Sequence, residues 1–360
     1  MTLSARDRER ARVWLAVVIA SLIAGIGYVQ VIEAFAGREF TLGDAVRGAV
    51  HGVIIGGGVG ASQLFYIDTR SGLWIRRAPF LASLVIRTAI AGAVIVIGLL
   101  IGRMLFEEVA STLLADPLGF LRDIVFSFCA FAVTFFVVQM WRIIGARVLA
   151  NFVIGRYNKP VREDRVFLFL DLAGSTALAR QMGDVGVYAL IAQVFFDIDQ
   201  VVVEYDGETH RYIGDELVVT WPLDAAIEEA RCVRCVMAIQ DMIAAKAETY
   251  ERAFGVVPAF RAGMHGGPVV AGECGDSKQE IVYFGDTINT AARIQAECKA
   301  LDVPFLVSGD LVARLALPDG LRATPCADVR LKGHEHKTPL FRIDRDGAEA
   351  RPAVPVRQAV

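Results

Sequence analysis

The stretch that decides the fold is Val166-Phe-Leu-Phe-Leu-Asp-Leu-Ala-Gly-Ser-Thr176. Its first five residues are apolar and partly aromatic, which predicts a buried strand that ends at Asp171. A helical pattern begins at Ala177, and either Ser175 or Thr176 is expected to cap it. A carboxylate at a strand end, followed by the N–H groups of a helix start, suits a metal ion that holds a polyphosphate. An aspartate that only ends a strand and caps a turn is the alternative.

Upstream of this stretch the composition changes. The chain has 360 residues, 54% of them hydrophobic, and the apolar excess lies in roughly the first 150 residues, which predicts a membrane region before a globular domain. The net charge of −3 argues against a nucleic-acid partner.

Four long apolar runs predict four transmembrane helices, at about 13–35, 45–67, 80–101 and 124–144. Arg47 and His51 interrupt the second run, and Arg87 interrupts the third. Buried helices of a soluble protein are the alternative, but four such runs in succession favour a bundle in a lipid bilayer.

The distribution of arginine predicts how this bundle is oriented. The N-terminal tail, the second connection and the segment after the fourth run are rich in arginine, whereas the other two connections carry more acids. Basic segments stay on the cytoplasmic side. We therefore expect a multi-pass protein of the inner membrane of the cell, with both termini and the globular domain in the cytoplasm.

His51 stands before a glycine-rich run that includes Gly52 and Gly56. The glycines predict close helix approach, and an ionisable residue inside a membrane is a candidate for function. In a dimer, two copies of His51 could bind a haem, although packing or an interfacial hydrogen bond is the favoured interpretation. What this region senses, whether a ligand or a regulator, is open.

The second half of the chain alternates strands and helices in a ferredoxin-like order. Strands are expected at about 166–171, 208–213, 216–221, 259–265, 269–273, 281–284, 303–307, 328–331 and 340–343, and helices at about 177–205, 224–250, 287–301 and 309–315. The predicted fold is an N-terminal α-helical transmembrane bundle followed by an α+β ferredoxin-like domain. Its expected divisions are 1–140 (four-helix transmembrane region), 141–160 (helical linker), 161–343 (globular domain) and 344–360 (disordered tail).

Two acids mark the edge of the predicted sheet. Asp171 ends one strand, and Asp215 occupies the tip of the predicted hairpin 208–221. Two carboxylates side by side are unfavourable unless a cation lies between them. Mg²⁺ takes oxygen ligands and leaves positions open for phosphate.

These residues fall in three ordered motifs that resemble the catalytic domain of class III nucleotidyl cyclases. The motifs are Phe-Leu-Asp171-Leu-Ala-Gly-Ser-Thr, Ile-Gly-Asp215-Glu and Phe-Gly-Asp-Thr-Ile-Asn289-Thr-Ala-Ala-Arg293, and Leu-Lys332-Gly also fits. The resemblance covers about residues 161–343. It implies a homodimer that binds ATP at the subunit interface and converts it to 3′,5′-cyclic AMP and pyrophosphate.

The resemblance also implies which residues would hold the metal ions. Asp171 and Asp215 of one chain would bind two Mg²⁺ or Mn²⁺ ions, with a backbone carbonyl from Leu172. The helix start at Gly174, Ser175 and Thr176 would bind the nucleotide.

The second chain of the dimer would supply the remaining groups. Asn289 would orient the ribose, Arg293 would stabilise charge on the reacting phosphate, and Lys332 would bind the terminal phosphates. Asn289 and Arg293 are four apart and therefore share one helix face. Lys278 is either a further phosphate ligand or an exposed loop lysine.

Two positions that read the base depart from the family pattern. Adenylyl cyclases commonly have lysine and an aspartate or threonine there, and this chain has Arg211 and Val282. Arg211 can donate to adenine N1 or to guanine O6, whereas Val282 accepts nothing. ATP is therefore favoured, because the N1–H of guanine would find no acceptor.

Other interpretations stay open. The chain could be a guanylate cyclase, or a membrane receptor whose cyclase-like domain is inactive, and a transporter is less well supported. Cys232 and Cys235 form a C-x-x-C that we interpret as two small buried side chains rather than a redox or metal pair. His334 and His336 could hold a metal, but a solvated loop is favoured.

Overall fold

The computed structural model describes residues 5–67, 75, 78–106, 117–144, 154–276, 279–330 and 337–346. It contains two compact units, Met1–Ala150 (unit 1) and Asn151–Val360 (unit 2).

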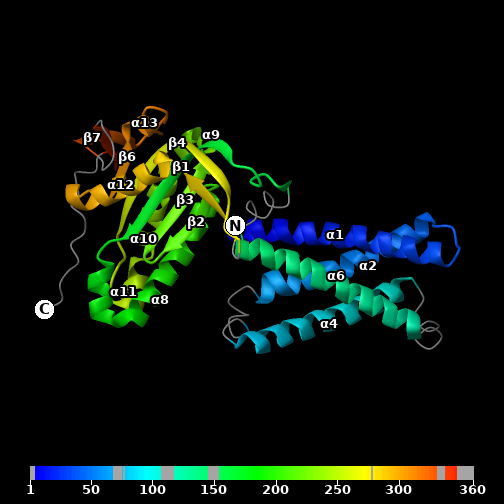
Figure 1. Cartoon of the computed structure of the whole chain (residues 1–360). Coiled ribbons are helices and arrows are strands. Elements are labelled where there is room, and N and C mark those ends of the chain that lie inside the picture. The colour runs from blue at the N-terminus through cyan, green and yellow to red at the C-terminus, as the bar shows by residue number, and fades with distance from the viewer. Residues whose placement is uncertain are drawn as a thin grey trace. The chain divides into compact units, whose positions relative to one another are not determined.

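Unit 1 is helical. Its described helices are α1 (Ala5–Phe35), α2 (Leu42–Ala61), α4 (Phe80–Leu105) and α6 (Pro117–Ile144), and the π-helical turn η1 (Ser62–Ile67) extends α2 (Figure 1). All four helices are long and apolar enough to cross a membrane. They coincide with the four predicted spans.

Small residues bring α1 and α2 together. A Cβ atom on Gly52 would lie 2.1 Å from the carbonyl oxygen of Ser21, and one on Gly48 would lie 2.5 Å from the carbonyl oxygen of Gly25. Any larger side chain at these places would separate the helices. The predicted close approach along the glycine run is therefore confirmed.

Unit 2 is built on one mixed sheet. The strands are β1 (Val161–Leu172), β2 (Glu208–Ile213), β3 (Glu216–Pro222), β4 (Phe260–Cys274), β5 (Glu280–Phe284), β6 (Phe305–Ser308), β7 (Leu321–Val329) and β8 (Thr338–Arg345). Their order is β2-β3-β1-β4-β6-β8-β7, with β5 paired to β4. The central strand β1 is antiparallel to both β3 and β4.

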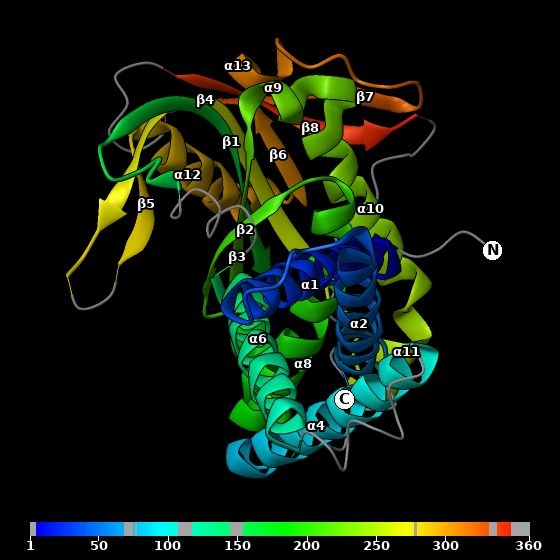
Figure 2. The ribbon, with the colours of Figure 1, turned by 90° about the vertical axis from the view of Figure 1, so that its right-hand side faces the viewer.

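Helices cover both faces of this sheet. They are α8 (Ser175–Glu204), α9 (Leu223–Ile227), α10 (Arg231–Ala245), α11 (Ala247–Phe254), α12 (Asp286–Leu301) and α13 (Gly309–Val312). α8 and α10 lie against one face, and α12 lies against the other (Figure 2). This is the catalytic fold of the class that the motifs indicate.

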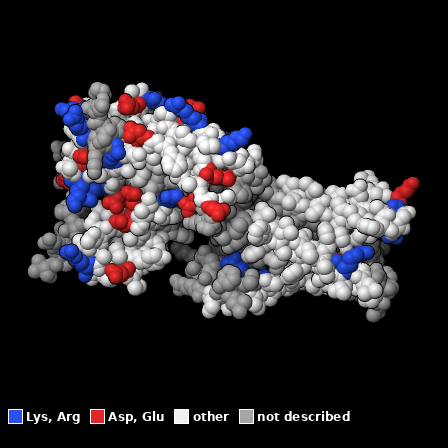
Figure 3. All heavy atoms as spheres, viewed as in Figure 1, with Lys and Arg blue, Asp and Glu red and all other residues white. Residues whose placement is uncertain are grey.

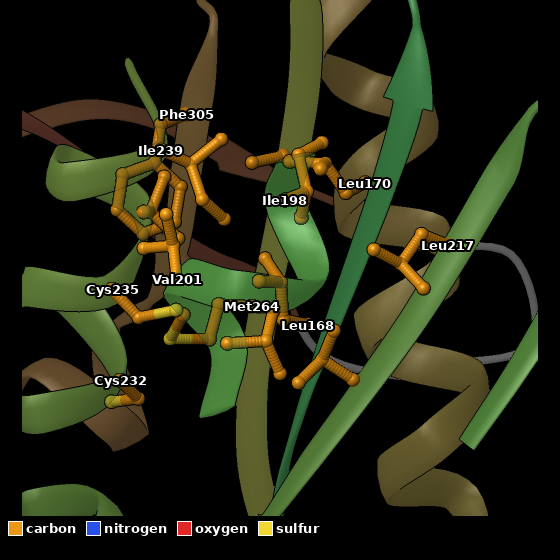
Figure 4. Close-up of a cluster of buried hydrophobic side chains, with 14 of the residues drawn as sticks. Leu168, Leu170, Ile198, Val201, Leu217, Cys232, Cys235, Ile239, Met264 and Phe305 are labelled. Atoms are coloured by element: carbon orange, nitrogen blue, oxygen red, sulfur yellow. The ribbon is translucent and has the colours of Figure 1, made fainter. Parts of the chain in front are cut away.

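Alternation along β1 distributes its side chains between the two faces. Leu168 and Leu170 are buried against α8 and α10 (Figure 4), whereas Phe167 and Phe169 are buried on the α12 side. Burying each such side chain contributes about 1.5–3 kcal/mol. Asp171 has the same parity as Phe167 and Phe169, so its side chain belongs to the α12 face.

α8 is a fifth helix with the length and composition of a membrane span. Its apolar side chains, among them Leu190, Val194 and Ile198, are instead buried in the core of unit 2. The helix bends at Gly183, which has φ +74°. Its hydrophobicity is therefore accounted for by the sheet that it covers.

Cys232 and Cys235 lie on α10 and are fully buried in the same core (Figure 4). Burial raises the pKa of the Cys232 thiol to about 12, so thiolate is scarce at neutral pH. The interpretation of the pair as two small buried side chains is confirmed.

The prediction of two strands at 259–265 and 269–273 is wrong, because β4 runs without a break through Gly266, Gly267 and Pro268. β1 pairs with β4 along its whole length, including Asp164 opposite Pro268. Gly267 leaves room for Thr287, whose hydroxyl donates to the Pro268 carbonyl oxygen at 2.7 Å. The glycines therefore leave space for α12 to pack on β4, and they do not end the strand.

The prediction of one helix at 224–250 is also wrong. Glu229 and Ala230 have φ near +50°, which separates α9 from α10. Ala226 and Ala230 are fully buried there, so a tight turn with small side chains replaces a helical turn. No glycine or proline marks this break in the sequence.

The chain ends of unit 2 differ from the expected divisions. Tyr157 is buried in the α12-side core, and its carbonyl accepts from the Glu273 N–H at 3.2 Å. Residues 155–159 form turns rather than the predicted helical linker, while 145–153 lie outside the described residues. β8 reaches Arg345, which pairs with Leu321, so order extends past the predicted start of the tail at 344. Residues 347–360 also lie outside the described part.

Candidate active site

Asp171 and Asp215 lie side by side at one edge of the sheet. β1 and β3 are neighbours, and their register places Asp171 opposite Glu216. The Leu172 N–H donates to the Asp215 carbonyl oxygen at 3.3 Å. The two carboxyl side chains lie close enough for Asp215 to raise the pKa of Asp171.

This arrangement concentrates negative charge. Burial and the neighbouring Asp215 raise the pKa of Asp171 to about 6, although Arg261 and a hydrogen bond from Gln295 oppose the shift. Burial and the same two aspartates also raise the pKa of Glu216. A cation between the carboxylates would remove this repulsion.

The donor set suits a hard divalent ion. Carboxylate and carbonyl oxygens are the ligands that Mg²⁺ and Mn²⁺ prefer. Over the described ranges, no three His, Cys, Asp or Glu side chains converge as a complete metal site. Asp171 and Asp215 would therefore need backbone or substrate oxygens to complete the coordination.

The N-cap of α8 is not the residue that the sequence predicts. Gly174, not Ser175 or Thr176, is the N-cap, and it has φ +76°. The Ala173 N–H is already held by the Ala259 carbonyl at 2.8 Å, so the chain must reverse at the next residue, where glycine tolerates the left-handed conformation. No side-chain hydrogen bond caps this helix start, and Thr176 is exposed.

α12 carries Asn289 and Arg293 on one side. Asn289 is exposed, and its side-chain amide donates to the Gly285 carbonyl oxygen at 3.3 Å. Arg293 is half-buried and lies 3.7 Å from Asp286. Within the described part of one chain, no hydrogen bond or ion pair joins either residue to Asp171 or Asp215.

The opposite side of α12 is pressed onto the sheet. A Cβ atom on Gly263 of β4 would lie 2.2 Å from the backbone nitrogen of Gln295, and the Cys298 thiol donates to the Ala262 carbonyl at 3.2 Å. This contact fixes the height of α12 above β4, and with it the position of Asn289 and Arg293.

Two polar residues beside the aspartates were missed by sequence reasoning. Gln295 is buried and acts to lower the pKa of Asp171, and Arg261 stands opposite Asp171 in the β1–β4 register. Gln295 had a recognisable signal, because it interrupts the apolar stripe of α12. Arg261 had none, because its position depends on the register of β4.

Arg211 and Val282 lie on β2 and β5. Val282 is half-buried and pairs with Gly272. Arg211 forms an ion pair with Glu280, which lies two residues before Val282 and so on the same face of β5. Glu280 is a third residue that sequence reasoning missed, and it places a carboxylate where none was expected.

Several predicted positions need separate mention. Lys278 and Lys332 lie outside the described residues, as do His334 and His336. Their assignments remain predictions.

Comparison with known proteins identifies the family of the second half of the chain. The family model described as the adenylate and guanylate cyclase catalytic domain matches residues 159–343. Adenylate cyclase 2 of Rhizobium meliloti (strain 1021) is 41% identical over 208 residues, which cover 58% of this chain and 57% of that protein. Adenylate cyclase 1 of the same organism is 25% identical over 283 residues, which cover 71% of this chain and 42% of that protein.

Among solved structures, the crystal structure of the adenylyl cyclase CyaB from P. aeruginosa superimposes with a TM-score of 0.46 and 16% identity, covering 54% of this chain and 99% of that one. The chain spans little more than half the length of the first curated relative and less than half of the second. With its family match over half of the sequence, the chain belongs to the adenylate and guanylate cyclase family.

Proposed function

We propose that this protein is a membrane-bound adenylate cyclase, which converts ATP to 3′,5′-cyclic AMP and pyrophosphate at the interface of a homodimer. The observation that carries the proposal is the Asp171–Asp215 pair, which lies inside the matched family region and accumulates charge that a metal ion would neutralise. The 41% identity to a protein named adenylate cyclase supports the choice of reaction.

Each catalytic centre would use residues from both protomers. Asn289 would bind the ribose and orient its 3′-hydroxyl toward the α-phosphorus. Arg293 would stabilise the negative charge that develops on the α-phosphate as pyrophosphate leaves. Lys332 and Lys278 would bind the outer phosphates, and the start of α8 at Gly174, Ser175 and Thr176 would contact the nucleotide.

The separation of these groups supports a dimer. Asn289 and Arg293 lie on the outward side of α12 and make no polar contact with Asp171 or Asp215 of their own chain, as far as the structure describes it. A second copy would bring the two sets together, since a two-fold axis gives two equivalent sites.

Asp171, Asp215 and the Leu172 carbonyl would hold two Mg²⁺ or Mn²⁺ ions. When bound, these ions supply Lewis-acid activation of the 3′-hydroxyl and neutralise phosphate charge.

We place the protein in the inner membrane, with the catalytic domain and both termini in the cytoplasm. The four helices of unit 1 are long and apolar enough to cross a bilayer. The arginine-rich segments support this orientation.

Guanylate cyclase activity is the second candidate, and the Arg211–Glu280 ion pair is compatible with it. Val282 offers no acceptor for the N1–H of guanine, but Glu280 supplies a carboxylate near Val282. An arginine donor beside a carboxylate acceptor can pair with adenine through N1 and N6, or with guanine through O6 and N1. The pair therefore suits either base, and the identity to a protein named adenylate cyclase supports ATP.

The deciding experiment is turnover by the purified full-length protein, with ATP and GTP offered separately and with Mg²⁺ or Mn²⁺. Cyclic AMP formation that disappears in Asp171→Ala is the expected result. Cyclic GMP as the main product would replace the proposed substrate. If a folded wild-type dimer made neither product, the domain would be an inactive cyclase-like receptor module.

A further inference from the structure

Unit 1 contains a cavity of about 420 Å³ that all four helices line. Small-molecule sites commonly have volumes of about 300–1,000 Å³. One part of the wall is apolar and includes Val17, Ile55, Val59, Leu99, Phe126 and Phe131. The other part is charged, and this division of the wall is what suggests a ligand.

Among the described residues, the charged part is rich in arginine. It contains Arg38, Arg47, Arg103 and Arg122, together with Glu33 and Asp123. Glu33 pairs with Arg38 at 2.6 Å and with Arg47 at 3.4 Å. Even with Asp44, which pairs with Arg47 from outside the lining, arginines outnumber acids among the residues that the structure describes here.

Arg103 on α4 gives the sharpest indication. Its side chain is 7% exposed, and its Nη2 donates to Asp123 at 2.8 Å. Its guanidinium lies 4.7 Å from the centre of the Phe120 ring. The Nη1 nitrogen is buried and has no hydrogen-bond partner within the described residues. A buried cationic donor without an acceptor is unfavourable, and an anionic oxygen in the cavity would satisfy it.

The position of the charges in the bundle also matters. They lie at the C-terminal ends of α1 and α4 and at the N-terminal ends of α2 and α6, which is a single end of the bundle. On the visible face of unit 1, blue and red atoms gather where α1 leads into α2, and the middle is nearly free of them (Figure 3). The proposed topology puts this end on the non-cytoplasmic side.

His51 belongs to the same wall. Its Nδ1–H donates to the Arg47 carbonyl oxygen at 2.9 Å, and its ring stacks on Phe106. Gly102 admits this ring, since a Cβ atom there would lie 2.4 Å from it. Haem binding by two copies of His51 stays a prediction, while the single-chain cavity offers a different kind of site.

We propose that this cavity binds a single-chain amphiphile with an acidic head, whose head group accepts from Arg103 and whose acyl tail lies among the apolar side chains. A ligand with a neutral head would bring no negative charge to the buried Arg103 guanidinium, whose Nη1 has no acceptor within the described residues. A small inorganic anion would leave the apolar part of the wall unfilled.

The test measures binding directly, without reference to cyclase activity. Dansyl-undecanoic acid is titrated into the full-length protein in nanodiscs, and its fluorescence is followed while dodecanoate, dodecyl phosphate or the neutral glycerol ester of dodecanoate competes. We expect both acids to displace the probe and the ester to do so at least about tenfold less well. Carboxylate and phosphate heads are thereby compared, and displacement by either one supports the proposal. Equal displacement by the ester would overturn it, because only the tail would then be recognised.

Variants locate the site. Arg103→Gln should weaken dodecanoate binding about tenfold or more, and Arg103→Lys should retain part of it. Arg87→Gln is the matched control, because it removes an arginine from the same helix but outside the cavity wall, and it should bind as the wild type does. Ala130→Phe leaves every charge in place and should block the tail, which keeps the proposal testable if Arg103→Gln does not fold. Wild-type affinity in Arg103→Gln or in Ala130→Phe would contradict the proposal.

Discussion

The carboxyl groups of Asp171 and Asp215 lie close together at the end of β1, although both are acids. Burial and this proximity raise the pKa of Asp171 to about 6. Protein without bound metal thus carries an unfavourable interaction between two acids. A cation bound between the carboxylates would relieve it.

Replacing Asp171 by Asn should stabilise the metal-free protein while abolishing turnover. A raised pKa means that the native state holds this proton between about pH 4 and 6 and the unfolded state does not, so wild-type stability falls as pH rises through that window. The gain at pH 7 should be no more than about 1 kcal/mol, because solvent screens the half-exposed pair. Thermal unfolding of the full chain in EDTA measures it, and the gain should shrink toward pH 4. Asp164→Asn, an exposed acid on the same strand, is the control. An Asp171→Asn variant that is less stable than wild type at pH 7 would contradict this prediction.

Mixing two inactive variants should restore activity if each site draws on both chains. Asp171→Ala and Arg293→Ala are each expected to be inactive as homodimers. In a mixed dimer one site receives both substitutions and the other receives neither, so random association should recover about 25% of wild-type turnover. Two tags and tandem purification isolate the mixed species, which should have about 50% of wild-type turnover because one of its two sites is intact. If it has no activity, the groups do not act across an interface between these chains.

Glu280→Ala should weaken binding of the nucleotide with little effect on stability. The substitution removes the acceptor beside Arg211, which leaves a donor for adenine N1 or guanine O6 but no acceptor for adenine N6–H or guanine N1–H. We expect a rise in KM for the natural substrate of about tenfold, as for loss of one charge-assisted hydrogen bond. Steady-state kinetics with both nucleotides provide the measurement. Glu248→Ala, which breaks a surface ion pair with Arg252 on α11, is the control. Unchanged kinetics would remove Glu280 from base recognition.

Gly263→Ala should lower both stability and turnover, because the new methyl group would meet the backbone of Gln295. Overpacking of this kind costs about 1–3 kcal/mol, and here the obstacle is main chain, which puts the cost at the upper end. Displacement of α12 would also move Asn289 and Arg293. Gly272→Ala lies on the same strand with its nearest contact at 3.6 Å and should be tolerated. The melting temperature and kcat of Gly263→Ala are compared with those of Gly272→Ala. Equal values for the two variants would show that α12 can shift freely.

His210 should make the protein acid-sensitive. Burial, Arg211 and Arg165 lower its pKa to about 4. The unfolded state therefore binds a proton that the native state does not, and stability falls as pH decreases from about 6.5 toward 4. The loss at pH 5 is on the order of 1–2 kcal/mol. His210→Phe should flatten this part of the pH profile in thermal unfolding, whereas a profile of unchanged slope would exclude His210 as its source.

Local patterns were sufficient for the parts of the fold whose signals are contiguous. The apolar run before Asp171, the hairpin around Gly214 and the helix that carries Asn289 all appear where the sequence predicts them. These features depend on residues within a few positions of one another. Their order along the chain then indicated the family.

Features that depend on distant partners could not be obtained in this way. β4 is unbroken because it pairs with β1 along its whole length and because the Thr287 hydroxyl donates to the Pro268 carbonyl oxygen. These contacts outweigh the tendency of the glycines to end a strand. The break at Glu229 and Ala230 follows from burial of small side chains. The Arg211–Glu280 ion pair joins positions 69 residues apart, and its consequence for the base could not be inferred from either position alone.

The interaction of Gln295 with Asp171, which acts to lower the pKa of that carboxyl group, connects α12 to the end of β1 within one protomer. In the proposed dimer, Asp171 serves one catalytic centre while Asn289 and Arg293, on the same helix as Gln295, serve the other. Nucleotide binding at the first centre would change the interactions of Asp171. Through Gln295 this change would reach α12, which carries residues of the second centre. Two chemically identical centres would then communicate, and the dimer would respond to nucleotide cooperatively rather than as two independent enzymes.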